Sequence, residues 1–188
     1  PLSEDASKVS LDDVYTKSEG TVFLNGIQAL VRLPIVQVAR DRAAGLKTAG
    51  FVTGYRGSPL GGYDLALAKA KHHLDNAGVV FMPAVNEELA ATALQGTQEV
   101  GLSPGRRHDG VFGIWYGKGP GADRTGDAFK HGNAMGSAAF GGVLCIVGDD
   151  HGAKSSTIPH QSEHTFAAST IPVLYPSSVH EFVRFGLL

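Results

Sequence analysis

The chain has 188 residues and a net charge of −2, with 16 Lys and Arg against 18 Asp and Glu. Both signs are scattered along the chain, which argues against a nucleic acid or an acidic membrane surface as a partner. No apolar run reaches the ~20 residues of a membrane span. The single Cys145 excludes an intramolecular disulfide or a cysteine-ligated iron–sulfur cluster within these residues, and a cytoplasmic, reducing compartment is predicted.

A polar leader, residues 1–20, precedes one predicted domain over residues 21–188. Helical spacing over 25–44 follows, with Pro34 marking a kink or a fresh helix start. Apolar runs predict strands at 49–55, 79–82, 111–116, 143–147 and 171–174. The stretches between them predict helices at 63–76, 87–100, 128–139 and 163–168.

This alternation favours an α/β fold with right-handed crossovers, in which a doubly wound, mainly parallel sheet carries helices on both faces. The apolar helical pattern at 182–188 runs to the last residue, so we expect a domain truncated at its C-terminal end. Glycine is about twice as frequent as its average usage of ~7%. The 25 glycines cluster at 54–62, 117–126 and 132–152, which predicts loops that turn tightly or approach a ligand.

Glu87 lies at the most informative position. A short apolar strand ends before Asn86 and Glu87, and this pair opens an Ala-rich helix. Ligands bind beyond the carboxyl ends of the strands in such sheets, so Glu87 is a candidate for a ligand-directed carboxylate. The alternative is a helix-dipole partner beside an N-cap asparagine.

Three further loops fall at the same predicted edge. The segment 54–62 offers a cation, a hydroxyl and backbone donors, but it lacks the dinucleotide and phosphate-loop spacings. The segment 115–124 combines aromatic residues, Lys118 and glycines. The segment 148–156 nearly spells a phosphate loop, but Asp149 and Asp150 would repel phosphates. These two carboxylates would instead orient a polar ligand or a cation, or pair with Lys154.

A rival pattern is His160-x-x-Glu163-His164, which matches inverted zinc peptidases, where two histidines share one helix face. Such a site needs a third protein ligand well downstream, and Glu181 is the only acidic residue after His164. We therefore expect no metal site in the chain. A zinc hydrolase stays an alternative, as does a noncatalytic α/β interaction module.

Six blocks in order, residues 25–32, 54–62, 85–93, 113–121, 129–133 and 148–164, resemble one family closely. It is the thiamine-diphosphate-dependent 2-oxoacid:ferredoxin oxidoreductases, and within them the indolepyruvate ferredoxin oxidoreductase family. The chain is similar to the N-terminal pyrimidine-binding domain of that family, which is an α/β sheet.

The resemblance implies a catalytic role for Glu87, whose counterpart contacts the N1′ atom of the cofactor's aminopyrimidine ring. Proton sharing at N1′ favours the imino tautomer, whose nitrogen removes the thiazolium C2 proton. The resemblance also places Tyr55, Gly57, Ser58 and Pro59 at the cofactor. Ser58 stands where related enzymes usually have Thr facing the substrate and the thiazole.

The implied reaction is oxidative decarboxylation of a 2-keto acid, of the indolepyruvate or arylpyruvate type, to an acyl-CoA with ferredoxin as electron acceptor. The candidates for meeting the substrate are Arg56, Ser58, Lys118, Asp150 and His151.

The Gly-Asp-Gly motif and distant Asn that hold magnesium and diphosphate do not occur in these residues. We therefore expect Mg, the diphosphate site and the [4Fe-4S] clusters in other domains of the same enzyme, with a dimer mate as a further partner. The 188 residues alone are predicted to be inactive.

Overall fold

The computed structural model describes residues 9–57 and 60–187. Its centre is a four-stranded sheet with strand order β2-β1-β3-β4, in which every pair is parallel. The strands are β1 (Ala49–Gly54), β2 (Val79–Phe81), β3 (Val111–Lys118) and β4 (Gly142–Gly148). The prediction of a doubly wound α/β fold is confirmed.

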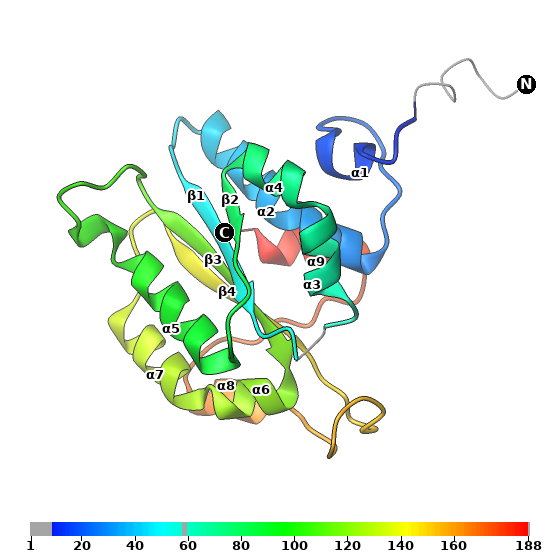
Figure 1. Ribbon diagram of the computed structural model, residues 1–188, viewed down its shortest axis with the longest axis vertical. Helices are drawn as coiled ribbons and strands as arrows, with labels where there is room; N and C mark the ends of the chain where they lie inside the picture. The colour runs from blue at the N-terminus through cyan, green and yellow to red at the C-terminus, as the bar shows by residue number, and fades with distance from the viewer. Residues whose placement is uncertain (1–8, 58–59, 188) are drawn as a thin grey trace, which may run out of the picture.

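Helices cover both faces of the sheet (Figure 1). One face packs against α2 (Gly26–Ala43), α3 (Tyr63–Lys69), α4 (Lys71–Ala77) and α9 (Val179–Gly186). The other face packs against α5 (Glu87–Gln98), α6 (Gly119–Arg124), α7 (Gly126–Met135) and α8 (Glu163–Ala168). Two short elements, α1 (Asp13–Thr16) and the 3₁₀ turn η2 (Val100–Leu102), lie outside these layers.

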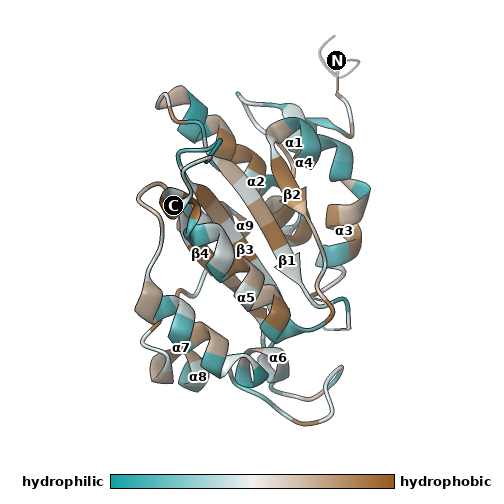
Figure 2. Ribbon diagram, turned by 60° about the vertical axis from the view of Figure 1, so that its left-hand side comes forward, coloured by the Kyte–Doolittle hydropathy of each residue, from teal (hydrophilic) through white to brown (hydrophobic). Residues whose placement is uncertain are grey.

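The strands alternate their side chains between two apolar clusters, as the period of two requires. Val52, Ile114 and Tyr116 belong to the cluster under α2, α3 and α4. Phe51 and Trp115 belong to the cluster under α5, α6 and α7. Figure 2 shows the apolar strands between helices whose outer surfaces are more polar.

Helix α2 begins with a capping box, because Asn25 Oδ1 accepts from the Gln28 N–H at 2.8 Å and Gln28 Oε1 accepts from the Asn25 N–H at 3.0 Å. It runs through Pro34 as one helix, so no new helix starts there. The helix predicted at 63–76 is instead two helices, α3 and α4, which meet at Ala70.

The strand predicted at 171–174 does not form. The N–H of Ile171 donates to the carbonyl of Phe166 at 2.9 Å, and Pro172 has no N–H to give to a ladder. Within the described ranges, β4 is therefore one of the two edge strands of the sheet, and β2 is the other. In the same ranges, no helix has both the length and the apolar character of a membrane span.

Candidate functional site

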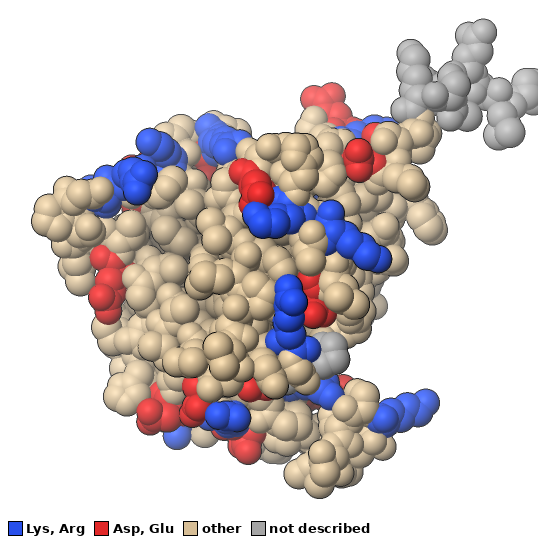
Figure 3. All heavy atoms as spheres, in the orientation of Figure 1, with Lys and Arg blue, Asp and Glu red and all other residues tan. Residues whose placement is uncertain are grey.

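The site lies where the parallel strands end. Glu87, Lys118 and Asp149 follow or end β2, β3 and β4, so the fold brings them to one edge. The helix α6 starts at the end of β3 and contacts both α5 and β4. On the face shown in Figure 3, acidic and basic side chains alternate along this edge, with no continuous patch of one sign.

Glu87 is the first residue of α5 and is buried, with 6% of its surface exposed. Asn86 caps the helix, since its Oδ1 accepts from the Leu89 N–H at 2.8 Å. The indole Nε1 of Trp115 donates to the Glu87 carbonyl at 3.1 Å. These bonds fix the backbone from which the carboxylate projects.

The Glu87 side chain packs against α6 at Gly121. A β-carbon at Gly121 would lie 2.8 Å from Glu87 Cγ and 2.9 Å from Oε1. Such contacts are too short for a real side chain, so only glycine allows this approach. The sequence analysis placed Gly121 in a glycine-rich run but gave no sign that it faces Glu87.

A second acidic centre follows β4. Asp149 Oδ2 accepts from both the N–H and the hydroxyl of Ser162, at 2.8 Å and 2.7 Å. A β-carbon at Gly119 would lie 2.7 Å from Asp149 Oδ1 and would collide with Nδ1 of His160. The missing side chain of Gly119 thus leaves room for both Asp149 and His160 beside the start of α6.

Asp150 and Lys118 organise the loop that continues from Asp149. Asp150 accepts from the N–H of Ser155 at 2.6 Å and of Lys154 at 3.0 Å, and these hydrogen bonds hold the pKa of Asp150 below its usual range. Lys118 Nζ donates to the Ser155 carbonyl at 2.5 Å. His151 is exposed on the same loop.

The loop after β1 places three of the predicted site residues at the same edge. Tyr55 is half-buried and forms a bridge to Ala84, while Arg56 and Gly57 are exposed. A β-carbon on Gly57 would collide with the Tyr55 ring. Ser58 and Pro59 lie outside the described residues.

Two buried polar residues, one on β3 and one on α3, were missed by the sequence analysis. The Tyr116 hydroxyl and Asp64 Oδ1 are buried and have no hydrogen-bond partner among the residues described. Burial, and then the Asp64 charge, raise the pKa of Tyr116 above its ordinary value, so the phenol stays neutral. Nothing local in the sequence marks this pair, because α3 packing on the sheet buries them.

The zinc-peptidase pattern does not form its helical site. Helix α8 starts at Glu163, so His160 lies before the helix and does not share a helix face with the exposed His164. The half-buried Cys145 lies on β4, where desolvation raises the pKa of its thiol to about 12 and leaves it protonated at neutral pH.

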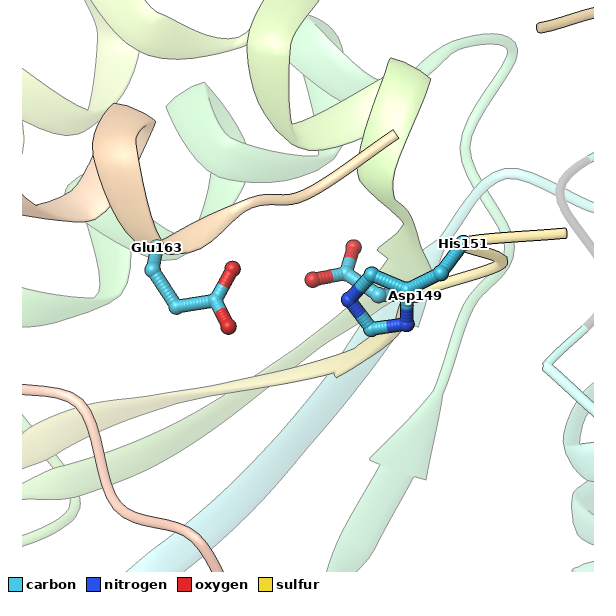
Figure 4. Close-up of side chains that lie close together, drawn as sticks. All are labelled: Asp149, His151 and Glu163. Atoms are coloured by element: carbon cyan, nitrogen blue, oxygen red, sulfur yellow. The ribbon is translucent and has the colours of Figure 1, made fainter. Parts of the chain in front are cut away.

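Asp149, His151 and Glu163 form a cluster of side chains of the kinds that bind metal ions. One ligand atom from each lies within 4.8 Å of the other two (Figure 4). This grouping of two carboxylates and an imidazole was not predicted.

No protein-family model, curated protein or solved structure matches the chain.

Proposed function

We propose that the chain supplies the aminopyrimidine-binding half of a thiamine-diphosphate-dependent 2-oxoacid:ferredoxin oxidoreductase of the indolepyruvate type. The observation that supports this most is the placement of Glu87. A buried carboxylate starts a helix at the ligand edge of a parallel sheet, and Gly121 lets its side chain pack closely against α6.

The residues present fit the pyrimidine half of this cofactor. Glu87 would hold a proton at N1′, and its capped, buried position would keep the carboxyl oriented. When bound, thiamine diphosphate supplies the nucleophilic carbon and the electron sink for decarboxylation. Tyr55, Gly57, Ser58 and Pro59 would border the cofactor.

The substrate side of the proposal rests on charge. The exposed Arg56 and His151 would meet the carboxylate of a 2-keto acid, with Ser58 adding a hydroxyl. Lys118 and Asp150 would act by holding the loop that presents His151, because both bind that loop's backbone. Coenzyme A, ferredoxin, Mg and the [4Fe-4S] clusters would be handled by other domains, in a cytoplasmic and oligomeric enzyme.

The test compares Glu87→Gln with Glu88→Gln in the complete enzyme. Both residues lie in the first turn of α5, but Glu88 bonds weakly to Arg124 at 3.4 Å on the surface. We expect Glu87→Gln to lower kcat about 10²–10⁴-fold, the usual effect of losing a proton-transfer group, and Glu88→Gln to leave it unchanged.

A second readout is proton exchange at the cofactor's reactive carbon, followed by NMR. Exchange should slow in Glu87→Gln while thiamine diphosphate still binds. Equal exchange and equal kcat in the two variants would rule out the proposed role of Glu87. A complete polypeptide that does not bind the cofactor would support the noncatalytic module instead.

A further inference from the structure

We propose that Asp149, His151 and Glu163 form a binding site for one divalent transition-metal ion, such as Zn²⁺ or Mn²⁺. Asp149 and His151 come from the loop after β4, and Glu163 is the first residue of α8. Their ligand atoms lie within 4.8 Å of one another, and Figure 4 shows the three side chains turned toward one space. This inference does not depend on the proposed function.

The first support is the state of the carboxylate oxygens. Asp149 Oδ1 and Glu163 Oε2 are both inaccessible to solvent, and neither has a hydrogen-bond donor in the described part of the chain. Leaving a buried acceptor without a donor is destabilising, and more so when the acceptor is charged. Two neighbouring carboxylates also repel each other. A divalent cation would remove both penalties.

The second support is the way the ligands are held. Ser162 is 6% exposed and donates its N–H and its hydroxyl to Oδ2 of Asp149. The other oxygen, Oδ1, is thus left for a further ligand. Ser162 directly precedes Glu163, so one residue positions both carboxylates. Partners that orient metal ligands in this way are a usual feature of metal sites.

The donor set indicates the kind of metal. Two carboxylates and one imidazole are a donor set typical of Zn²⁺ or Mn²⁺. Ca²⁺ and Mg²⁺ are instead bound by oxygen ligands alone. Three protein ligands leave a coordination position open for water or a substrate oxygen. His160 offers a fourth donor nearby, because its buried Nδ1 also lies beside Gly119 and has no partner within the described ranges. His164 takes no part, which separates this site from the zinc-peptidase pattern.

The test is calorimetric titration of the chelator-treated 188-residue chain with Zn²⁺ and with Mn²⁺. We expect one equivalent of either ion to bind. His151→Ala and Glu163→Gln should each weaken binding at least tenfold, whereas His164→Ala, an exposed histidine on the same helix as Glu163, should not change it. Circular dichroism checks that each variant is folded.

Co²⁺ gives a second readout that needs no activity. Its visible absorption should report nitrogen and oxygen ligation in the wild-type chain and change in His151→Ala. His151 is exposed, so this variant is expected to keep the fold. The proposal is overturned if neither Zn²⁺ nor Mn²⁺ binds at one equivalent. It is equally overturned if binding survives the double variant of His151 and Glu163, or if His164→Ala weakens it as much as His151→Ala does.

Discussion

Gly119 and Gly121 occupy the first turn of α6, where the backbone passes next to two acidic side chains. Gly121 faces Glu87, and Gly119 faces Asp149. At both positions a β-carbon would come within 3 Å of carboxylate atoms, so the missing side chain is a packing requirement. The positions of the two acidic side chains at this edge therefore depend on two glycines, which have no functional group themselves.

Gly121→Ala tests this requirement. The new methyl group should displace Glu87, and overpacking of this kind typically costs about 1–3 kcal/mol. The matched control is Gly96→Ala in α5, where a β-carbon meets nothing within 4 Å and helix propensity favours Ala by about 0.5–1 kcal/mol. Urea denaturation should give Gly121→Ala a free energy of unfolding about 1.5–4 kcal/mol lower than that of Gly96→Ala. Equal stability of the two variants would contradict the close packing of Glu87.

Single residues also show the limit of sequence patterns at this scale. Glu87 could be predicted as a site residue because the sequence shows where the strand ends and the helix begins. Asp149 was weighed only as half of an Asp pair, yet it bonds Ser162 and lies beside Glu163 while Asp150 serves its own loop. The two aspartates are adjacent in sequence, so only the folded loop distinguishes them.

At the scale of elements, the start of α5 is the piece that positions Glu87. Asn86 has extended backbone and its side chain accepts the Leu89 N–H, which satisfies one of the free donors of the first turn. Trp115 on β3 holds the same turn from the sheet. The sequence analysis gave this cap as part of the alternative interpretation of the turn, because Asn before an Ala-rich helical stretch is a local signal.

Asn86→Ala should lower the free energy of unfolding by about 1 kcal/mol, since the cap is lost, while Asn86→Asp keeps an acceptor and should lose much less. Thermal or urea denaturation of the two variants measures the difference. If both variants lose the same amount, the Asn86 side chain does not act as a cap.

Two of the elements that differ from their prediction do so because of their backbone hydrogen bonding and conformation. The segment 171–174 has the apolar composition of a strand, but its first N–H is bound by the end of α8 and its second residue is proline. The helix predicted at 128–139 ends at Met135, because Gly136 takes a positive φ of 78°.

At the scale of the whole molecule, the sheet separates two apolar clusters that differ in what covers them. The cluster under α2, α3 and α4 contains most of the fully buried large side chains, including Leu67 and Leu74. The cluster under α5, α6 and α7 lies behind the Glu87 turn and includes Trp115. The helix start that carries Glu87 thus lies on the sheet face opposite the larger cluster.

Leu67→Ala and Leu65→Ala test the first cluster within one helix. Leu67 is fully buried and Leu65 is 64% exposed, and both lie in α3. The first change should cost about 2–5 kcal/mol through lost burial and a cavity. The second should stay within about 0.5 kcal/mol, as is usual for surface positions. Guanidinium denaturation would refute the assigned packing if Leu65→Ala proved the more destabilising.

The sequence by itself determined the alternation of strands and helices, the parallel α/β class and the position of Glu87 at a helix start. These follow from signals within a few residues, namely the period of apolar side chains, caps and turns. The tertiary structure alone decided that Gly121 faces Glu87 and that Asp149, His151 and Glu163 gather. Each of these depends on how segments far apart in the chain pack and share hydrogen bonds, which no local pattern specifies.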